Sequence, residues 1–353
     1  MTVEMRQVPL LDGPVEFRGA LDLQRTETGV LPWRLPRWTR AQFPNEAVAR
    51  MAALPSGVRM AFRTAATVLE VEALAADIGV LELVIDGVRT GRAEFAADRP
   101  ARVRFDVLSG GEKDVEVWLP QRARTELIGL WADAEVAPPR RTGRRRWVHH
   151  GSSVSHYPQA DSPFDTWPVL ASVHAGVELT NLSLAGNARL DPFVARAIRD
   201  ERAELISLKL GLNVVTGADF KLRSFLPAVH GFLDTVREGH PDTPVLVVSP
   251  ISCPPLEEVP GPAGTDSEGR FTALGDPAQV ASGALTVGVV RAELARIVAA
   301  RRDPHLHHLD GRELLGPGDL AELPDLLHPS PAGHRRMAER FAARAFGPDG
   351  PFA

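Results

Sequence analysis

The chain has 353 residues, of which 44% are hydrophobic and 24% are charged, a composition that is ordinary for a globular protein. At this length we expect two domains rather than a single core. The formal net charge of -5 argues against a nucleic-acid-binding protein, and we interpret the basic run over residues 140–146 as part of a solvated linker. The single cysteine, Cys253, excludes an intrachain disulfide and a cysteine-based metal site, and it fits a reducing, cytoplasmic setting.

No segment has the roughly 18 apolar residues that a membrane span needs. The first residues also lack the apolar run of a signal peptide. We therefore expect a soluble protein that is not exported by the usual signal. The 30 glycines and 30 prolines indicate many turns rather than long helical arrays.

Residues 1–137 show the two-residue periodicity of short β-strands. Apolar and polar residues alternate, and turn signals interrupt them, as at Asp86-Gly87, a favoured hairpin turn. This pattern predicts an all-β, jelly-roll-like antiparallel sandwich with one solvated face on each sheet. The segments that we expect to be strands are residues 20–25, 57–64, 68–74, 81–88, 102–107 and 114–119.

A Pro-rich loop over residues 31–44 carries three aromatic side chains, Trp33, Trp38 and Phe43. They either plug the sandwich or its junction with the next domain, or they form a stacking platform for a ligand. Sandwich modules of this kind often bind a carbohydrate or a partner protein. Residues 138–146 then have the Pro, Gly and Arg content of a linker.

From residue 147 onward, expected strands alternate with expected helices. This alternation predicts an α/β domain over residues 147–353, with a parallel sheet between layers of helices and the active face at the carboxyl ends of the strands. We expect strands from Arg146 and over residues 177–184, 204–210 and 244–250, and helices over residues 166–175, 192–199, 225–237, 287–301 and 331–346.

The stretch from Arg146 to Pro158 looks like a strand that ends in a turn of small residues. Trp147 is a strand former, and Gly151 can adopt a positive φ without steric cost. Either Ser152 or Ser153 then stands at the carboxyl end of a strand. A serine on such a turn is a candidate nucleophile.

A nucleophilic serine needs a base, an orienting carboxylate and donors for the oxyanion of a tetrahedral intermediate. Gly186 follows the second expected strand, where it allows a backbone N–H to point into the site. Asn213 follows the third, and its side-chain amide can donate a second hydrogen bond. Asp325 and His328 stand three residues apart near the carboxyl end, so that one turn can bring carboxylate and imidazole together.

The order of these blocks, Gly-x-Ser, Gly, Gly-x-Asn and Asp-x-x-His-Pro, resembles the SGNH, or GDSL, hydrolase superfamily over residues 148–346. The preceding sandwich resembles that of a bacterial two-domain subgroup. The resemblance implies a flavodoxin-like catalytic domain in which Ser153 is the nucleophile, His328 the general base and Asp325 its partner. It also implies an oxyanion hole formed by the N–H of Ser153 with Gly186 and Asn213. We expect no cofactor and no metal.

The chain departs from the family pattern at two positions. Ser152 stands where the family has Asp before the nucleophile, and Val214 stands where Asp usually follows the third-block Asn. Neither departure removes a triad or oxyanion group, but both leave the substrate open. Ser152 is also the competing nucleophile, and the alignment with Gly-Asp-Ser favours Ser153.

Six other histidines lie near the expected site residues or near the last expected helices. Those beside the nucleophile turn are expected to be buried with satisfied hydrogen bonds, with a role in orienting substrate as the alternative: His149, His150 and His156. Those near the last expected helices resemble a metal cluster but have no carboxylate motif to complete it, and we interpret them as structural: His305, His307 and His308.

The segment over residues 253–285 is rich in Pro and Gly and long for a connection inside a compact domain. Segments of this length are usually functional or disordered. We expect this one to cover an acyl pocket, with Phe271 and Leu274 as apolar contacts.

The sequence thus predicts an acyl-transfer enzyme that works through an acyl-Ser153 intermediate on a small-molecule acyl ester or acyl donor. With water as acceptor it is an esterase, and we favour this interpretation because esterases are the commoner activity among similar proteins. With a hydroxyl of a small molecule, for example a polyketide, it is an acyltransferase. A third interpretation is a non-catalytic protein that binds a glycan or a partner. The acyl group, the acceptor and the oligomeric state stay open.

Overall fold

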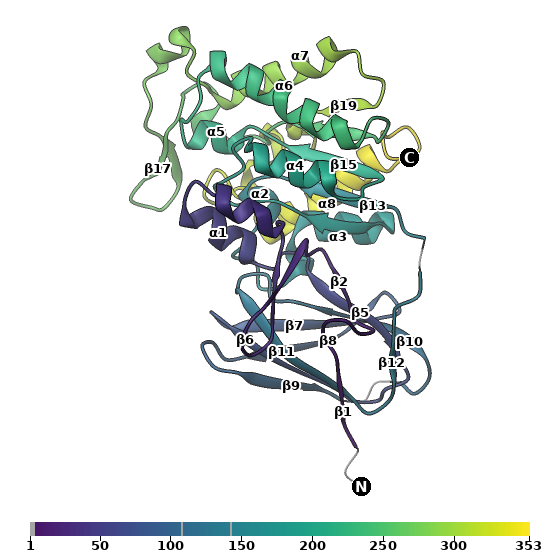
Figure 1. Cartoon of the computed structure of the whole chain (residues 1–353). Coiled ribbons are helices and arrows are strands. Elements are labelled where there is room, and N and C mark those ends of the chain that lie inside the picture. Colours follow the sequence, from purple (N-terminus) through teal and green to yellow (C-terminus); the bar gives the residue numbers. More distant parts are fainter. Residues whose placement is uncertain (1–3, 107–108, 142) are drawn as a thin grey trace. The chain divides into compact units, whose positions relative to one another are not determined.

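The structure is a computed structural model that describes residues 4–106, 109–141 and 143–353 (Figure 1). The chain divides into two compact units, Met1–Gly143 with Pro158–Pro163, and Arg144–Tyr157 with Phe164–Ala353. The domain and linker predicted over residues 1–146 include residues 1–3, 107–108 and Thr142, which lie outside the described residues. Within the described part, no helix combines the length and apolar character that a membrane crossing requires.

The N-terminal unit contains two antiparallel sheets. Their strands are β1 (Arg6–Val8), β2 (Glu16–Arg18), β3 (Asp22–Arg25), β4 (Val30–Trp33), β5 (Arg59–Thr64), β6 (Leu69–Ala75), β7 (Gly79–Ile85), β8 (Val88–Phe95), β9 (Ala101–Phe105), β10 (Lys113–Trp118), β11 (Thr125–Ala132) and β12 (Val136–Ala137). One sheet has the order β3-β4-β11-β6-β9, with β1 on β11, and the other has the order β12-β5-β10-β7-β8, with β2 on β5. The predicted all-β sandwich is confirmed.

Alternation along the strands builds the core of this unit. In β6, Leu69 and Val71 are buried while Glu70 between them is half-buried, because successive side chains point to opposite faces of a sheet. These residues join one hydrophobic cluster with residues of the other sheet, among them Phe62 of β5 and Leu83 of β7. The apolar faces of the two sheets therefore pack against each other.

Several details of this unit differ from the prediction. The strand expected over residues 81–88 ends at Ile85, because Asp86 and Gly87, with φ of 47° and 82°, form a hairpin turn into β8. β9 ends at Phe105, and Val107, the last residue of the strand expected there, lies outside the described residues.

The Pro-rich stretch over residues 31–44 is not a plain loop. It begins in β4 and contains a 3-10 helix, η1 (Arg37–Gln42), and the unpredicted helix α1 (Glu46–Ala53) follows it. Trp33 is held within the unit, since the Arg40 guanidinium lies 4.1 Å from its ring centroid and its indole N–H donates a 3.0 Å hydrogen bond to Gln24. Trp38 is 40% exposed.

The C-terminal unit contains a parallel sheet of five strands, β13 (Arg146–His150), β14 (Glu178–Asn181), β15 (Leu205–Lys209), β16 (Val245–Val248) and β19 (Leu306–Leu309). Their order is β14-β13-β15-β16-β19, and every neighbouring pair is parallel. This is the strand order of flavodoxin-like folds, as predicted. All residues of β15 and β16 are buried, as expected for a sheet covered on both faces.

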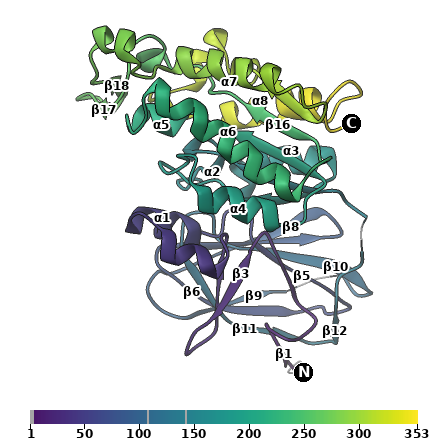
Figure 2. The same ribbon diagram turned by 45° about the horizontal axis from the view of Figure 1, so that its top comes forward.

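The helices of this unit are α2 (Ser153–His156), α3 (Trp167–Ala175), α4 (Pro192–Asp200), α5 (Leu212–Thr216), α6 (Leu222–Gly239), α7 (Val287–Arg301) and α8 (Pro331–Ala345). Helix α3 packs against α8, while α4 packs against α6 and α6 against α7 (Figure 2). Right-handed crossovers between parallel strands place the first pair on one face of the sheet and the other three helices on the opposite face. The carboxyl edge of the sheet is left to the loops.

Two connections are more ordered than expected. The segment over residues 253–285 contains two 3-10 helices, η3 (Pro254–Leu256) and η4 (Pro277–Ser282), and a hairpin of β17 (Ala263–Thr265) and β18 (Phe271–Ala273). The basic run is largely exposed, as expected, but two of its residues are held: Arg140 pairs with Asp114, and Arg145 donates hydrogen bonds to the carbonyl groups of Phe352 and Ala353.

Candidate active site

Strand β13, which lies between β14 and β15, ends directly before the candidate nucleophiles. Ser152 caps helix α2, and its Oγ accepts a hydrogen bond from the N–H of Val154 at 3.4 Å. Ser153 is the first residue of that helix and is half-buried. The turn therefore points the two hydroxyls in different directions, and only the Ser153 hydroxyl meets a histidine.

Gly151 is required here for a reason other than the one expected. It does not adopt a positive φ. A Cβ at this position would lie 2.7 Å from Ser155 Oγ and 3.3 Å from His149 Nε2, so a larger residue would have to displace side chains around the turn. The positive φ that glycine permits is therefore not used at Gly151, where crowding by side chains favours glycine instead.

The base and its carboxylate come from residues 323–329, which we call the base loop. His328 Nε2 lies 2.8 Å from Ser153 Oγ, and His328 Nδ1 lies 2.7 Å from Asp325 Oδ2. The other carboxylate oxygen of Asp325 accepts the backbone N–H groups of Leu327 and His328. Leu326 has a φ of 67°, a left-handed conformation that is uncommon for leucine and that turns the chain back on itself.

These contacts favour the ionised form of the Asp325 carboxyl. Burial alone would raise the pKa of the Asp325 carboxyl, but the hydrogen bonds from the His328 side chain and from the backbone outweigh burial and lower this pKa. The ionised carboxylate accepts the Nδ1–H of His328 and leaves Nε2 free of a proton. Nε2 can therefore accept the proton of the Ser153 hydroxyl.

The loop after β14 lies along the nucleophile turn. The N–H groups of Leu182 and Leu184 donate to the carbonyl oxygens of His149 and Gly151 at 2.7 and 2.9 Å, although the strand that we expected to reach residue 184 ends at Asn181. Gly186, two residues further on, has a φ of 68° and nothing near the place of a Cβ, so its glycine requirement is conformational.

Asn213 stands on helix α5 rather than on a strand end. The preceding Gly211 has a φ of 104°, and a Cβ there would collide with Val290. The Oδ1 of Asn213 accepts a 3.1 Å hydrogen bond from the backbone N–H of Ala188, whereas its Nδ2 makes only a long contact, 3.5 Å, with Thr216. The amide group is thus held by its oxygen and keeps its NH₂ available.

Three potential donors come from the nucleophile turn, from the loop that is hydrogen-bonded to it, and from helix α5, which is hydrogen-bonded to that loop. Within the described residues, the N–H groups of Ser153 and Gly186 take part in no hydrogen bond. With the NH₂ of Asn213, they match the donor types that stabilise the oxyanion of a tetrahedral intermediate. The arrangement can activate a hydroxyl nucleophile and stabilise the charge that its attack on a carbonyl creates.

Hydrogen bonds and ion pairs of the flanking residues hold the base loop. Glu322 accepts the N–H of Ser330 through its carbonyl group and the Ser330 hydroxyl through its carboxylate. Asp319 receives hydrogen bonds from Arg340 and Arg336 on α8. The bonds from Arg340 lower the pKa of the Asp319 carboxyl, and burial opposes them less strongly. The loop is therefore closed at both ends onto α8.

The histidines near the nucleophile are buried, as expected, but their hydrogen bonding is mixed. His150 Nδ1 lies 2.9 Å from the carbonyl oxygen of Leu182, and His156 Nδ1 accepts the N–H of Ala185 at 3.3 Å. His149 Nδ1 lies 2.7 Å from Ser207 Oγ, whereas its Nε2 has no partner among the described residues. None of the three contacts the Ser153 hydroxyl in the described structure.

The second histidine group is part of the sheet. His307 and His308 belong to β19, and burial lowers the pKa of both imidazoles. Within the described residues, no group of three or more His, Cys, Asp and Glu side chains is arranged to hold a metal ion. Burial and the charge of Glu257 raise the pKa of the Cys253 thiol to about 12, so this thiol is a poor nucleophile.

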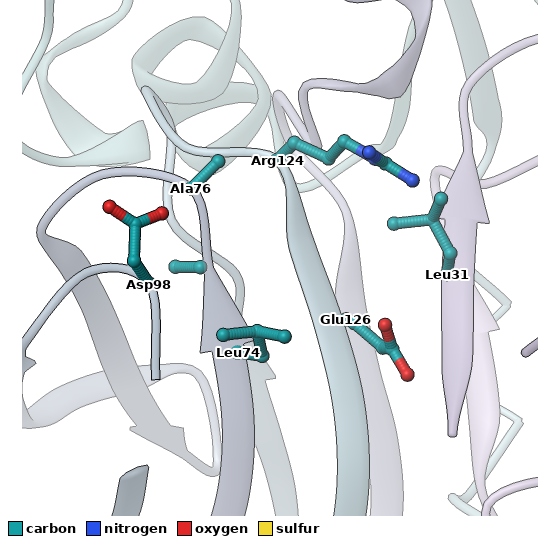
Figure 3. A pocket seen from close by; sticks show the side chains of 7 residues that line it. Leu31, Leu74, Ala76, Asp98, Arg124 and Glu126 are labelled. Atoms are coloured by element: carbon teal, nitrogen blue, oxygen red, sulfur yellow. The ribbon is translucent and has the colours of Figure 1, made fainter. Parts of the chain in front are cut away.

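The N-terminal unit has a hollow of about 230 Å³ beside β4, β6 and β11. Asp98 lies on one side of Leu74 and Glu126 on the other (Figure 3). No serine, cysteine or histidine lines the hollow, so it lacks a nucleophile and base for acyl transfer. Its lining residues are Leu31, Leu74, Ala75, Ala76, Asp98, Arg124 and Glu126.

Sequence reasoning missed two supports of the site. Arg189 Nε donates a 3.2 Å hydrogen bond to the carbonyl oxygen of Gly186, and the same guanidinium pairs with Asp219 after α5. Phe271, expected only as a pocket contact, packs its ring against the imidazole of His328. Neither has a sequence signal, because both depend on contacts between distant segments.

Both the sequence and the structure of this chain are similar to those of known proteins. Residues 15–127 match the family described as the SsfX3 N-terminal domain. The structure of the salicylyl-acyltransferase SsfX3 from a tetracycline biosynthetic pathway is similar to this one, with 30% sequence identity, a TM-score of 0.83 and coverage of 96% of both chains. No curated protein matches the chain in a sequence comparison.

Two further structures share the fold at lower identity. One is a putative GDSL-like lipase from Bacteroides ovatus, with 18% identity, a TM-score of 0.70 and coverage of 96% of both chains. The other is a family two carbohydrate esterase from Cellvibrio japonicus, with 12% identity, a TM-score of 0.64 and the same coverage. At these identities the similarity concerns the fold alone.

Proposed function

The chain belongs to the SGNH, or GDSL, hydrolase superfamily and is an acyl-transfer enzyme, and from this membership we propose that it forms an acyl-Ser153 intermediate and passes the acyl group to a hydroxyl of a small molecule. The observation that carries the catalytic part is the contact of His328 Nε2 with Ser153 Oγ at 2.8 Å. The choice of acceptor is supported by the full-length relative at 30% identity, a salicylyl-acyltransferase.

In the first half of the proposed reaction, His328 takes the proton of the Ser153 hydroxyl as Oγ attacks the carbonyl carbon of the acyl donor. The tetrahedral intermediate collapses when the bond to the leaving group breaks. His328 returns the proton to that leaving group. The product of this half is an ester between the acyl group and Ser153.

In the second half, the acceptor hydroxyl gives its proton to His328 and attacks the acyl carbon. Collapse of the second intermediate breaks the bond to Ser153 Oγ, which regains the proton from His328. Asp325 stays ionised throughout, keeps Nδ1 protonated and stabilises the imidazolium. The proposed role of the Ser153 and Gly186 N–H groups and of Asn213 is to donate to the oxyanion in both halves.

Hydrolysis is the second candidate. The side chains of His328 and Asp325 are 26% and 30% exposed, so water can reach the base without any movement of the chain. With water as acceptor, the same two steps make the protein an esterase.

We also propose a cytoplasmic setting and no nucleic-acid partner for this enzyme. These two expectations rest on the single cysteine and on the net charge of -5.

The test is intact-protein mass spectrometry after incubation with p-nitrophenyl esters, with wild type and Ser153→Ala side by side. We expect an acyl adduct on wild type alone. A small-molecule alcohol or polyphenol is then added, and an adduct that resolves mainly into the acylated alcohol indicates an acyltransferase. Resolution by water at the same rate with and without the alcohol indicates an esterase. An adduct on both proteins would exclude Ser153 as the nucleophile.

A further inference from the structure

The β17–β18 hairpin connects the two halves of the site. At its base, Gly261 lies against the carbonyl oxygen of Val215 in α5, so closely that a Cβ would collide with it. On its other strand, the backbone N–H of Phe271 donates a 2.8 Å hydrogen bond to the carbonyl oxygen of Asp325. One side of the hairpin thus contacts the helix of Asn213, and the other contacts the base loop.

The Phe271 ring lies against the general base. Its centroid is 5.3 Å from that of the His328 imidazole, and the two planes meet at 69° in an edge-to-face contact. Phe271 is only half-buried, so part of its ring stays accessible. The same imidazole lies 2.8 Å from Ser153 Oγ through its Nε2. An acyl group bound to that Oγ and the Phe271 ring would therefore both lie next to the same imidazole.

On this face of the hairpin the Phe271 side chain is the larger one, since Ala273, two residues further along the same strand, carries only a methyl group. Leu274, which we expected to line the pocket with Phe271, follows it by three residues and so points to the opposite face of the strand. Its side chain lies over Gly264 and is 64% exposed. At the turn, Arg270 pairs with Asp266 and Glu268 at 3.0 and 3.2 Å, so these charges satisfy one another.

We propose that Phe271 forms the apolar wall of the acyl pocket and makes the enzyme prefer acyl groups with a sizeable apolar body over acetyl. The inference deepens the proposed function and rests on the acyl-Ser153 intermediate. A ring contributes apolar surface that a longer acyl chain can cover, whereas an acetyl group is too short to gain from it. The exposed Leu274 takes no part in this selection.

The test compares p-nitrophenyl acetate with p-nitrophenyl hexanoate on the full chain. We expect Phe271→Ala to lower kcat/KM for the hexanoate about tenfold more than for the acetate, mainly through KM. Phe271→Leu should recover part of the preference. Leu274→Ala, the matched control from the same hairpin, should leave the ratio of the two esters unchanged.

Two results would overturn the proposal. In one, Phe271→Ala lowers kcat/KM by the same factor for both esters, and the loss is in kcat. That result would mean that the ring only positions His328. In the other, Leu274→Ala changes the ester ratio as much as Phe271→Ala does. Either outcome removes the assignment of chain-length preference to Phe271.

A binding measurement separates this proposal from the mechanism. Hexanoate and acetate are titrated calorimetrically into Ser153→Ala and into Ser153→Ala/Phe271→Ala. We expect the second substitution to weaken hexanoate binding severalfold and to leave acetate unchanged, and equal hexanoate affinities would refute the wall. If wild type forms no adduct with either ester, the acyl-Ser153 mechanism fails, and the titration still decides the role of Phe271.

Discussion

The side-chain carbonyl of Asn213 accepts a 3.1 Å hydrogen bond from the backbone N–H of Ala188. This bond joins helix α5 to the loop that carries Gly186. Because Asn Oδ1 is used in this way, the NH₂ group of the same amide is the part left to face a substrate. The two proposed oxyanion donors are therefore fixed relative to each other by one side chain.

Replacement of Asn213 by Ala should lower kcat by about 10² to 10³ and change KM little, because an oxyanion donor acts on the transition state. Steady-state kinetics with a p-nitrophenyl ester gives both constants. Asn187→Ala is the matched control, since the amide of Asn187 donates only to the carbonyl of Ala185, at 2.7 Å in the same loop. Comparable losses in both variants would contradict a special role of Asn213.

Replacing Ser152 and Ser153 one at a time distinguishes the serine that caps α2 from the serine that acts as the nucleophile. Ser152→Ala should cost about 0.5 to 2 kcal/mol of folding free energy, because it removes the cap of α2, and should leave kcat within a few-fold. Ser153→Ala should lower kcat by about 10³ or more with little loss of stability. Urea denaturation and ester hydrolysis measure the two effects, and the reverse pattern would assign the nucleophile to Ser152.

The pH profile should show one acidic limb. Protonation of His328 removes the base, and Asp325, whose pKa is lowered by its hydrogen bonds, stays ionised in the same range. We therefore expect log kcat/KM to fall with a slope of one as the pH decreases. A profile that is flat from pH 5 to 8 would contradict a histidine base, and a slope of two would mean that a second group titrates with it.

Asp319 should stabilise the fold in a pH-dependent way. Because its pKa is lower in the folded chain than in the unfolded chain, its contribution is full above the unfolded value of about 3.9 and is lost as the pH falls through the folded value. Asp319→Asn should cost about 1 to 3 kcal/mol at pH 7 and progressively less below about pH 4.

Chemical denaturation at several pH values measures this difference. Asp200→Asn provides the control, since Asp200 also pairs with an arginine, Arg199, but is largely exposed, and we expect it to cost no more than about 0.5 kcal/mol. An Asp319→Asn effect that is independent of pH would show that the ion pairs with α8 are not its source.

The sequence was sufficient to predict the layers of the fold and those residues whose type is dictated by the chemistry of acyl transfer. Helix α7 begins and ends where the pattern predicted, and the side chain of Thr286 caps its N-terminus by accepting the N–H of Val289. Strand β11 was missed because a bulge between Leu127 and Gly129 shifts the alternation of buried residues partway along it. Strand β19 was missed because two of its four residues are histidines.

The candidate site shows the same division. The structure brings Ser153, His328 and Asp325 together, and these residue types were predicted from what acyl transfer demands. Their supports, such as Arg189 on the carbonyl of Gly186, were not predicted, because any polar residue at many positions could serve. For Gly151 the residue was singled out correctly but for the wrong reason, since steric crowding is visible only in the packed structure.

The contact between Ser153 and His328 joins residues that are 175 positions apart. Contacts of such long range form late in folding, because a large loop must close before they are made. A chain folded only as far as β16 would already have the serine and the proposed oxyanion donors but no base to activate it. Enzymatic activity should therefore return only in the last phase of refolding, after most of the sheet has formed.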